Sequence, residues 1–420
     1  MPGGIPDGKA ESMAAMTRPK KWRKWRHRLA RTVLAGVMGP ASRILFGCRP
    51  EPFRPADRRG YLILFNHQTV FDQFFIGLSF RDPVYFVSTE DLFSMGIVSS
   101  VIRFFVAPIP FMKQTSDIAA LRTCMQVARE GGNVAVAPEG NMTYSGKTEY
   151  MRKSIASLAK ALNLPVALYR IEGGYGIQPR WGRKLRRGKM RAYVSRVIEP
   201  EEYANYTADE LYAVIRDGLT VNECRDDGQR YRSRRRAEHL ERAAYFCPRC
   251  GLASFESKGS RITCGACGIT VEYGEDKRLR GVNCDFPYEW FSEWYDAQKA
   301  FILALDPERH LETPLFRDQA DLYDVDVCRK KKRLRKAADV ALYGDRIVIG
   351  EGGANALTLP FRDMSAASLQ ILNKLNLCMD DGTVYQLRGG TRFNAMKYIN
   401  LCYRFQQMTG RNREPDYLGF

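Results

Sequence analysis

The stretch Tyr61–Gln73, YLILFNHQTVFDQ, begins as an apolar run and becomes polar at its end. Its first part, Tyr61–Phe65, is typical of a buried strand, because short continuous apolar segments occur in sheets that are covered on both faces. A strand alone does not account for His67, or for Asp72 five residues later. A histidine at the carboxyl end of a buried strand projects from the sheet edge at which α/β folds build their sites. The stretch therefore predicts a strand and also the place of a site.

Apolar runs of strand length alternate with helical patterns between residues 60 and about 200. Such alternation predicts an α/β domain in which helices flank a mixed β-sheet that is at least partly parallel. Thr207 and Glu210 form a capping-box pattern at the start of a further long helix. The expected strands are Tyr61–Phe65, Val84–Ser88, Asn133–Ala137, Val166–Arg170 and Met190–Val197, and the expected helices run to Arg129 and over Tyr150–Leu162.

The last third of the chain has a different pattern. Residues 286–305, FPYEWFSEWYDAQKAFILAL, predict a helix whose Trp290 and Trp294 pack in the core. A basic run at 329–336, RKKKRLRK, precedes several short strand patterns and one final helical pattern. This order resembles that of pleckstrin-homology or GRAM-like domains, and we expect a small β-rich domain of that kind at 331–420.

The composition is that of a basic globular protein. The chain has 420 residues, enough for two or three domains, with 45% hydrophobic residues and a formal net charge of +18. A charge of this sign favours a polyanionic partner, either nucleic acid or an anionic membrane. The best candidate for a membrane span, Leu29–Phe46, is interrupted by Arg31, Pro40 and Arg43. With no secretory signal pattern, we expect a cytoplasmic protein whose 11 cysteines are metal ligands or thiols.

Residues 17–48 begin with TRPKKWRKWRHRLARTVL, which places eight Lys or Arg between Arg18 and Arg31 and no acid. Indole rings beside cations are typical of a helix that lies in a membrane interface. We therefore expect residues 17–48 to form basic amphipathic membrane-interface helices, although the same apolar stripe could pack on the next domain. Residues 1–16 are expected to be disordered. The stripe at helical spacing is formed by Trp22, Trp25, Leu29, Val33 and Val37.

The chemistry of a His67–Asp72 pair is that of an oriented base. The carboxylate would accept a hydrogen bond from one imidazole nitrogen and fix the tautomer, which leaves the other nitrogen free to take a proton. The natural proton donor is then a substrate hydroxyl, and the chemistry is direct attack of an alcohol on an activated acyl group. A His and an Asp at this spacing also occur by chance, in which case His67 is a core histidine.

Three segments in sequence order carry a family resemblance. Asn66–Asp72, NHQTVFD, has the form N-H-x4-D, and Val136–Asn141, VAPEGN, is an apolar strand that ends in Pro-Glu-Gly. Leu164–Ala167, LPVA, is an apolar-Pro-apolar strand. In this order and spacing, the segments resemble the glycerolipid acyltransferase family, in particular 1-acylglycerol-3-phosphate O-acyltransferases, over residues 60–200.

The resemblance implies His67 as the general base and Asp72 as its orienting partner. It implies an acyltransferase domain at 49–243 that ends in a linker helix, and acyl-CoA or acyl-carrier protein as the acyl donor. The substrate-binding residues that we expect are Asn66, Lys113, Glu139 and Gly140.

The sequence departs from the family pattern at the acceptor site. Where the family carries an aromatic residue followed shortly by arginine, the segment Phe104–Lys113 offers only a lysine. A lysine supplies a point charge and no bidentate fork for a phosphate. After Gly140, the family's Thr-Arg is replaced by Asn141-Met142. Lysophosphatidic acid, another lysophospholipid and a different alcohol all stay open as the acceptor.

Two C-x2-C pairs, CPRC at 247–250 and CGAC at 264–267, predict a metal site. Each pair brings two thiolates together in a turn, and the glycine after each pair lets backbone amides approach the sulfurs. Four thiolates complete a tetrahedral structural zinc site with no position left for catalysis. We expect a zinc ribbon at 244–274 and an aromatic helical connector at 275–330. The expected zinc ligands are Cys247, Cys250, Cys264 and Cys267.

Together these patterns predict a peripheral membrane O-acyltransferase on the inner face of an anionic membrane. It would transfer a fatty acyl group to the hydroxyl of a lysolipid acceptor, and no specific nucleic-acid partner is expected. Two alternatives remain. The basic runs and the cysteine pairs also suit a nucleic-acid-binding zinc-ribbon protein, and a lipid-binding scaffold with an inactive acyltransferase domain would share the same sequence features.

Overall fold

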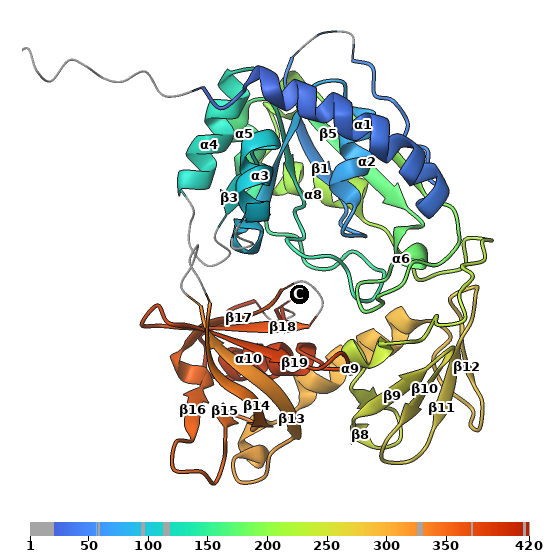
Figure 1. The fold of residues 1–420 in the computed structure, drawn as a ribbon, viewed down its shortest axis with the longest axis vertical. Coiled ribbons are helices and arrows are strands. Elements are labelled where there is room, and N and C mark those ends of the chain that lie inside the picture. The colour runs from blue at the N-terminus through green and yellow to red at the C-terminus, as the bar shows by residue number, and fades with distance from the viewer. Residues whose placement is uncertain are drawn as a thin grey trace, which may run out of the picture.

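The structure is a computed structural model of the chain. It describes residues 21–55, 57, 59–93, 97–111, 118–325, 331–370, 373–414 and 417–419. The expected disordered segment 1–16, Lys113 and the start of the basic run at 329–336 lie outside these ranges. An α/β domain lies above two smaller β-rich units that share one side of it (Figure 1).

The α/β domain is built on a six-stranded sheet in the order β3-β2-β4-β1-β5-β6. The first five strands of the chain are parallel in this sheet, and β6 is antiparallel to β5. The prediction of a mixed, partly parallel sheet is therefore confirmed, with β3 as a strand that the sequence did not reveal. The strands are β1 Leu62–Phe65, β2 Val84–Thr89, β3 Ile109–Phe111, β4 Asn133–Val136, β5 Val166–Glu172 and β6 Arg191–Ile198.

Strand β1 is buried on both faces, which explains its uninterrupted apolar sequence. Leu62 and Leu64 belong to a core formed with α4, α5 and α8. Ile63 and Phe65 belong to a second core, on the other face, formed with α1 and α2. The helices are α1 Trp25–Phe46, α2 Asp72–Ser79, α3 Ile97–Phe105, α4 Ile118–Arg129, α5 Ser154–Leu162, α6 Gly174–Ile177, α7 Pro200–Tyr203 and α8 Ala208–Leu219.

The residues of the apolar stripe predicted near the N-terminus have two different environments: one packs on the protein, and the others are exposed to solvent. The indole N–H of Trp22 donates to the carbonyl of Ala107 at 3.1 Å, and its backbone N–H donates to the Glu130 carboxylate at 3.0 Å. Trp22 therefore packs on the α/β domain. It does not belong to the exposed membrane-interface stripe in which we predicted it. Trp25 is 76% exposed, and Leu29, Val33 and Val37 are also exposed. Among the described residues, no helix is long and apolar enough to cross a membrane.

Two smaller sheets follow the α/β domain. Strands β7 Phe246–Cys247 and β8 Gly251–Leu252 form a hairpin. Beside it lies a four-stranded antiparallel sheet in the order β12-β11-β10-β9. Its strands are β9 Phe255–Lys258, β10 Arg261–Cys264, β11 Thr270–Tyr273 and β12 Leu279–Gly281, and helix α9 Phe291–Ala304 follows them.

The C-terminal unit is a seven-stranded antiparallel sheet in the order β16-β15-β14-β13-β19-β18-β17, followed by one helix. Strand β13 lies inside the segment 275–330, which we predicted to be a helical connector, so the β-rich unit begins earlier than expected. The likeness to pleckstrin-homology or GRAM-like domains stays a prediction. The elements are β13 Phe316–Asp324, β14 Lys332–Leu342, β15 Arg346–Ile349, β16 Leu357–Pro360, β17 Met364–Gln370, β18 Lys374–Met379, β19 Val384–Gly389 and α10 Met396–Met408.

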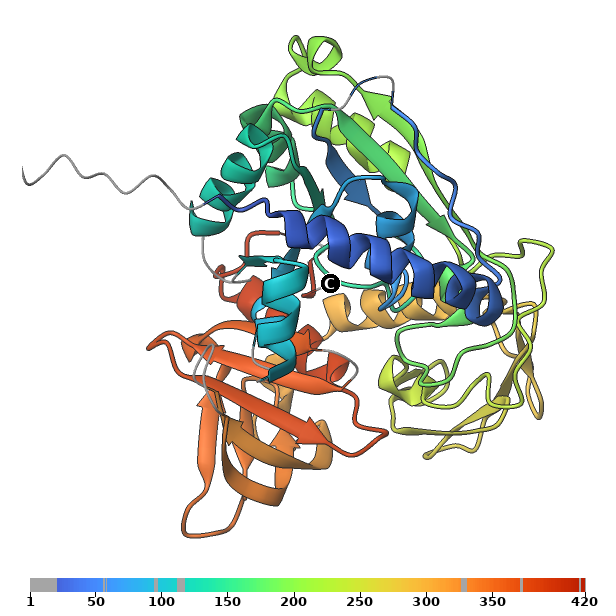
Figure 2. The ribbon, with the colours of Figure 1, turned by 45° about the horizontal axis from the view of Figure 1, so that its top comes forward.

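One hydrophobic core joins all three units. It begins with Tyr144 and Trp181 of the α/β domain and continues without a break through the cysteine-rich unit, α9 and the C-terminal sheet to Leu418. The ring of Trp181 contacts Tyr273 in β11 and Phe291 in α9, at centroid distances of 5.6 Å and 6.5 Å. Apolar packing of this extent fixes neighbouring elements. The C-terminal unit is therefore held against the side of the α/β domain on which the cysteine-rich unit also lies (Figure 2).

Candidate active site

The candidate site lies where two neighbouring parallel strands end. Strands β1 and β4 pair with Leu64 opposite Val136, so the residues that follow both strands meet at the carboxyl edge of the sheet. His67 follows β1 and Glu139 follows β4. The backbone N–H of Thr143 donates to the carbonyl of His67 at 3.2 Å, which ties the two loops together.

The imidazole of His67 is held by the carboxylate of Asp72. His67 Nδ1 lies 2.8 Å from Asp72 Oδ2. An ionised carboxylate only accepts hydrogen bonds, so Nδ1 carries the proton and Nε2 has a free lone pair. The His67 side chain is 26% exposed, whereas that of Asp72 is fully buried. The pair therefore has one solvent-accessible base and one buried orienting group.

Asp72 is fixed in turn by the segment between the two residues. It opens α2, and its carboxylate accepts the backbone N–H of Gln68 at 2.7 Å and that of Thr69 at 3.0 Å. The Thr69 hydroxyl donates to Asp72 Oδ1 at 2.7 Å. These backbone and hydroxyl donors hold the carboxylate in place, so its side chain cannot turn away from His67.

Glu139 joins the His67 loop to the loop that follows β4. Its carboxylate accepts the backbone N–H of His67 at 3.1 Å and that of Glu149 at 3.3 Å. Glu139 also lines the cavity described below, but the protein around its carboxyl group desolvates it and raises its pKa to about 8, against the effect of these two N–H groups. Because both oxygens bind the backbone, Glu139 acts as a positioning group for His67.

Asn66 does not lie where we predicted. Its side chain is fully buried and exchanges two hydrogen bonds with Ile171 in β5, donating to the carbonyl and accepting from the N–H, both at 2.8 Å. Asn66 therefore holds the end of β1 to β5 and is not a substrate-binding residue. Gly140 does line the cavity, with a φ of 69° that favours glycine. The position of Lys113 lies outside the described residues.

A cavity of about 1100 Å³ opens at His67. On one side its wall is apolar and comes from α1, α2, α3 and β2; on the other it reaches the C-terminal unit. A concave, mostly apolar space with a few convergent polar groups is the usual form of a site for a small molecule. Members of the apolar wall include Leu34, Met38, Phe74, Leu78, Phe86 and Ile102.

Arg180 is a cavity residue that the sequence did not reveal. Its side chain is almost fully buried, and one guanidinium nitrogen donates to the carbonyl of Met142 at 2.8 Å. The guanidinium also lies 4.8 Å from the centre of the Tyr144 ring. Burial lowers the pKa of Arg180, as expected for a cation taken out of water. We read this arginine only as part of a basic run, because its distance in sequence from His67 gives no local signal.

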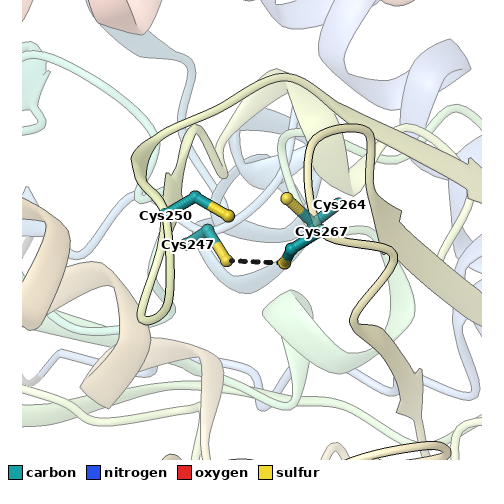
Figure 3. A group of neighbouring side chains, drawn as sticks. All are labelled: Cys247, Cys250, Cys264 and Cys267. Carbon is teal, nitrogen blue, oxygen red and sulfur yellow. Dashed lines mark hydrogen bonds between the residues drawn. The ribbon is translucent and has the colours of Figure 1, made fainter.

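The four cysteines predicted to bind zinc do converge (Figure 3). Their sulfurs all lie within 4.8 Å of one another, and the Sγ atoms of Cys247 and Cys267 are 3.7 Å apart. Gly251 and Gly268 follow the two pairs with φ values of 75° and 72°, in the left-handed region that glycine tolerates. The backbone N–H of Ile269 lowers the pKa of the Cys267 thiol, whereas burial raises the pKa of Cys247 and the hydrogen bond with Cys267 raises that of Cys250. Four convergent sulfurs fit a tetrahedral metal ion.

Comparison with known proteins shows which protein family the α/β domain is similar to. Residues 49–171 match the acyltransferase family model. The chloroplastic 1-acyl-sn-glycerol-3-phosphate acyltransferase BAT2 of Brassica napus is 24% identical over 158 residues, which cover 37% of this chain and 45% of that protein. The fold and the matches define an acyltransferase domain. This domain is similar to those of the 1-acyl-sn-glycerol-3-phosphate acyltransferases.

Two solved structures are also similar. The 1-acyl-sn-glycerophosphate (LPA) acyltransferase PlsC from Thermotoga maritima has 20% identity and a TM-score of 0.39, covering 47% of this chain and 80% of that chain. The C-terminal domain of an unknown protein from Leishmania infantum has 11% identity and a TM-score of 0.16, covering 22% and 84%. The chain spans less than half the length of the curated Brassica relative.

Because the pKa of Glu139 is raised in the folded protein, we expect the free energy of unfolding to depend on pH. In the unfolded chain this carboxyl group ionises near its ordinary value of 4.5, but in the folded protein it does so near 8. Between these values the unfolded state releases the proton first, so the free energy of unfolding falls as pH rises. For one carboxyl group this slope is at most about 1.4 kcal/mol per pH unit.

Glu139→Gln removes this ionisation. Denaturant unfolding at several pH values between 4.5 and 8 should therefore show the difference in unfolding free energy moving in favour of Glu139→Gln as pH rises. Glu201→Gln, a change on the short helix α7 away from the cavity, is the control and should follow wild type. Parallel curves for wild type and Glu139→Gln would contradict the assignment.

Proposed function

We propose that the protein is an O-acyltransferase that moves a fatty acyl group from an acyl thioester to the hydroxyl of a lysophospholipid-like acceptor. The observation that carries this proposal is the His67–Asp72 pair, 2.8 Å apart, at the head of a largely apolar cavity within an acyltransferase domain. The acyl donor is acyl-CoA or acyl-carrier protein, the two thioester carriers that suit such a reaction.

The chemistry follows from the free Nε2 of His67. It accepts the proton of the acceptor hydroxyl while that oxygen attacks the thioester carbon, and the protonated ring is stabilised by Asp72. The new carbon–oxygen bond forms, the carbon–sulfur bond breaks, and the proton passes from His67 to the leaving thiolate. No covalent enzyme intermediate is needed. A positioned base of this kind contributes roughly 10²–10⁴ in rate.

The acceptor that the cavity favours is an anionic lipid. Its apolar wall suits an acyl chain, and Arg180 brings a positive charge to the same cavity as His67. The positive charge of Arg180 therefore supports an acceptor with a phosphate group.

An anionic membrane is the proposed source of this acceptor. Helices α1 and α3 lie side by side, and the guanidinium of Arg26 lies 4.0 Å from the centre of the Phe104 ring. They share an exposed apolar surface, here called the α1–α3 surface, with exposed Arg28 and Arg103 on the same helices. Apolar side chains ringed by cations suit an interface with anionic lipid. The α1–α3 surface consists of Trp25, Leu29, Val33, Val37, Ile97, Val101 and Phe104.

The nucleic-acid alternative has less support from the arginines. Two of the basic runs that suggested it, residues 180–196 and 230–242, contain buried arginines. Arg186 donates to the carbonyl of Arg236 at 2.6 Å, and Arg242 donates to those of Thr391 at 2.7 Å and Trp181 at 3.2 Å. Because Arg186 and Arg242 are buried and bind the protein's own carbonyls, they do not form part of an exposed basic surface for nucleic acid.

The four-cysteine group is proposed to hold a structural zinc ion, bound by Cys247, Cys250, Cys264 and Cys267. Zinc would fix the turns of a unit whose sheet is small, and metal binding then contributes directly to folding. The site has no role in the acyl transfer.

Activity assays test the proposed reaction. We expect wild type, given an acyl thioester and a lysolipid, to release free thiol together with acylated lipid. His67→Ala should lower the rate by about 10²–10⁴, and Asp72→Asn should lower it because the imidazole loses its orienting carboxylate. His310→Ala, in the connector before β13, is the matched control. Equal rates in wild type and His67→Ala on every acceptor would refute the enzyme proposal and favour the inactive scaffold.

Vesicle co-sedimentation tests the membrane partner. The double variant Leu29→Glu/Val33→Glu should lower binding to vesicles of mixed anionic and zwitterionic phospholipid by about tenfold or more, because two exposed apolar side chains that would enter the membrane interface are replaced by anions. Val282→Glu changes an exposed apolar side chain beyond the α1–α3 surface and should bind as wild type does. Salt-sensitive binding to duplex DNA without vesicle binding would support the nucleic-acid alternative instead.

Elemental analysis tests the metal. Purified protein should contain about one zinc ion per chain. Cys264→Ser should lose it and unfold at a lower temperature, whereas Cys284→Ser changes a nearby cysteine outside the group of four and should keep it. Zinc well below one per chain in wild type, prepared without chelator, would contradict this proposal.

A further inference from the structure

The cavity that contains His67 does not belong to the acyltransferase domain alone. Residues of the C-terminal unit line it as well: Ala366–Gln370 on β17, Tyr403 on α10, and Tyr417 and Gly419 near the end of the chain. These residues lie far from the family motifs in sequence, and the segment that matches the acyltransferase family ends at residue 171. A separate unit therefore completes the wall of the candidate active site.

Strand β17 is well suited to form a fixed wall. It lies at one end of the strand order of its sheet. Ala367 and Leu369 are buried, whereas Ala366 and Ser368 are only partly buried. Ala366 and Ser368 are two residues apart and therefore share the face of the strand opposite to that of Ala367. Both are small, so an enlarged side chain there would take up cavity space directly.

The segment 417–419 closes the wall beside β17. The Tyr417 ring lies between Tyr150 of the acyltransferase domain and Tyr403 of α10, at centroid distances of 5.0 Å and 5.1 Å. Its carbonyl accepts hydrogen bonds from the Gln407 and Asn412 side chains at 3.2 Å and 3.1 Å. This segment therefore bridges the two units at the cavity.

The next residue strengthens the same attachment. Leu418 is buried, and its carbonyl accepts a hydrogen bond from the Asn400 side chain at 2.6 Å. The Tyr245 hydroxyl donates to the same Asn400 side chain, also at 2.6 Å. Because these contacts continue into the common hydrophobic core, the wall is preformed.

Several polar side chains of the cavity lie on this wall. Ser368, Gln370, Tyr403 and Tyr417 offer hydroxyl and amide groups there. Burial raises the pKa of the Tyr417 phenol, and the positive charge of Arg152 and its hydrogen bond to the phenol oppose this shift. The Arg152 backbone N–H donates to the carbonyl of Pro138 at 3.5 Å, next to Glu139 in sequence. On α1 and α3 most lining side chains are apolar, and His27 and Arg31 are the polar members there.

This polarity orients the acceptor. The acyl chain of a lysolipid gains most from the apolar side, which is also the side of the α1–α3 surface, and its charged end then lies toward β17. We propose that the C-terminal unit forms the headgroup pocket of the acceptor site, so that β17 and Tyr417 select among lysolipids by the size of the group attached to their phosphate. This inference rests on the proposed acyl transfer, and it adds the part of the chain that decides the acceptor.

The test compares two acceptors that share one acyl chain. One is a lysolipid with an unsubstituted phosphate, and the other carries a glycerol on its phosphate. The quantity measured is the ratio of kcat/KM for the larger acceptor to that for the smaller one, because this ratio reports discrimination between substrates. Thermal unfolding of every variant accompanies the assays.

Two variants should move this ratio in opposite directions. Ser368→Phe fills the wall and should lower it by about tenfold or more, whereas Tyr417→Ala removes a wall side chain and should raise it by several-fold, in line with the usual size of pocket effects. Thr358→Phe makes the same kind of change on the exposed face of β16, at the opposite end of the sheet order, and should leave the ratio as in wild type.

The outcomes separate this inference from the proposed function. If wild type acylates neither these lysolipids nor any other, the proposed function fails. If wild type is active but Ser368→Phe and Tyr417→Ala both keep the wild-type ratio within twofold, only the headgroup pocket is overturned. If Ser368→Phe unfolds early, Tyr417→Ala alone decides: a raised ratio supports the pocket, and an unchanged ratio overturns it.

Discussion

The buried carboxylate of Asp72 is the constraint on which the site depends. It accepts hydrogen bonds from His67 Nδ1, from two backbone N–H groups and from the Thr69 hydroxyl. A buried anion is costly unless its hydrogen bonds are made, so the segment from His67 to Asp72 must adopt the turn that supplies them. The same turn directs the free nitrogen of His67 into the cavity. The hydrogen bonds that fold the segment from His67 to Asp72 therefore also orient the imidazole of His67.

Around this turn, each neighbouring segment fixes a different part of the site. Asn66 holds the end of β1 to β5, and Glu139 holds the backbone of His67 to the loop after β4. The common core then places the C-terminal unit against the same opening. Precise catalytic geometry requires such support behind the reacting groups, and here it comes from segments spread over most of the chain.

The parts that the sequence predicted are those with local signals. The apolar run of β1, the His67–Asp72 spacing, the Pro-Glu-Gly turn and the two cysteine pairs each act over a few residues, and the capping box of Thr207 and Glu210 is present as expected. The misplaced features depend on contacts between distant segments. Trp22 binds Glu130 and Ala107, Asn66 binds Ile171, and Arg180 reaches the cavity from beyond β5. Periodicity carries no information about such pairings.

We propose that His67, which lines the cavity, removes the proton of a lipid hydroxyl bound there. The most direct measurement is a crystal structure of the full chain with a bound lysolipid. We expect the acceptor hydroxyl oxygen to lie within about 2.6–3.2 Å of His67 Nε2, while His67 Nδ1 keeps its hydrogen bond to Asp72. A lipid that occupies the cavity with its hydroxyl directed away from His67 and bound to another basic group would contradict it.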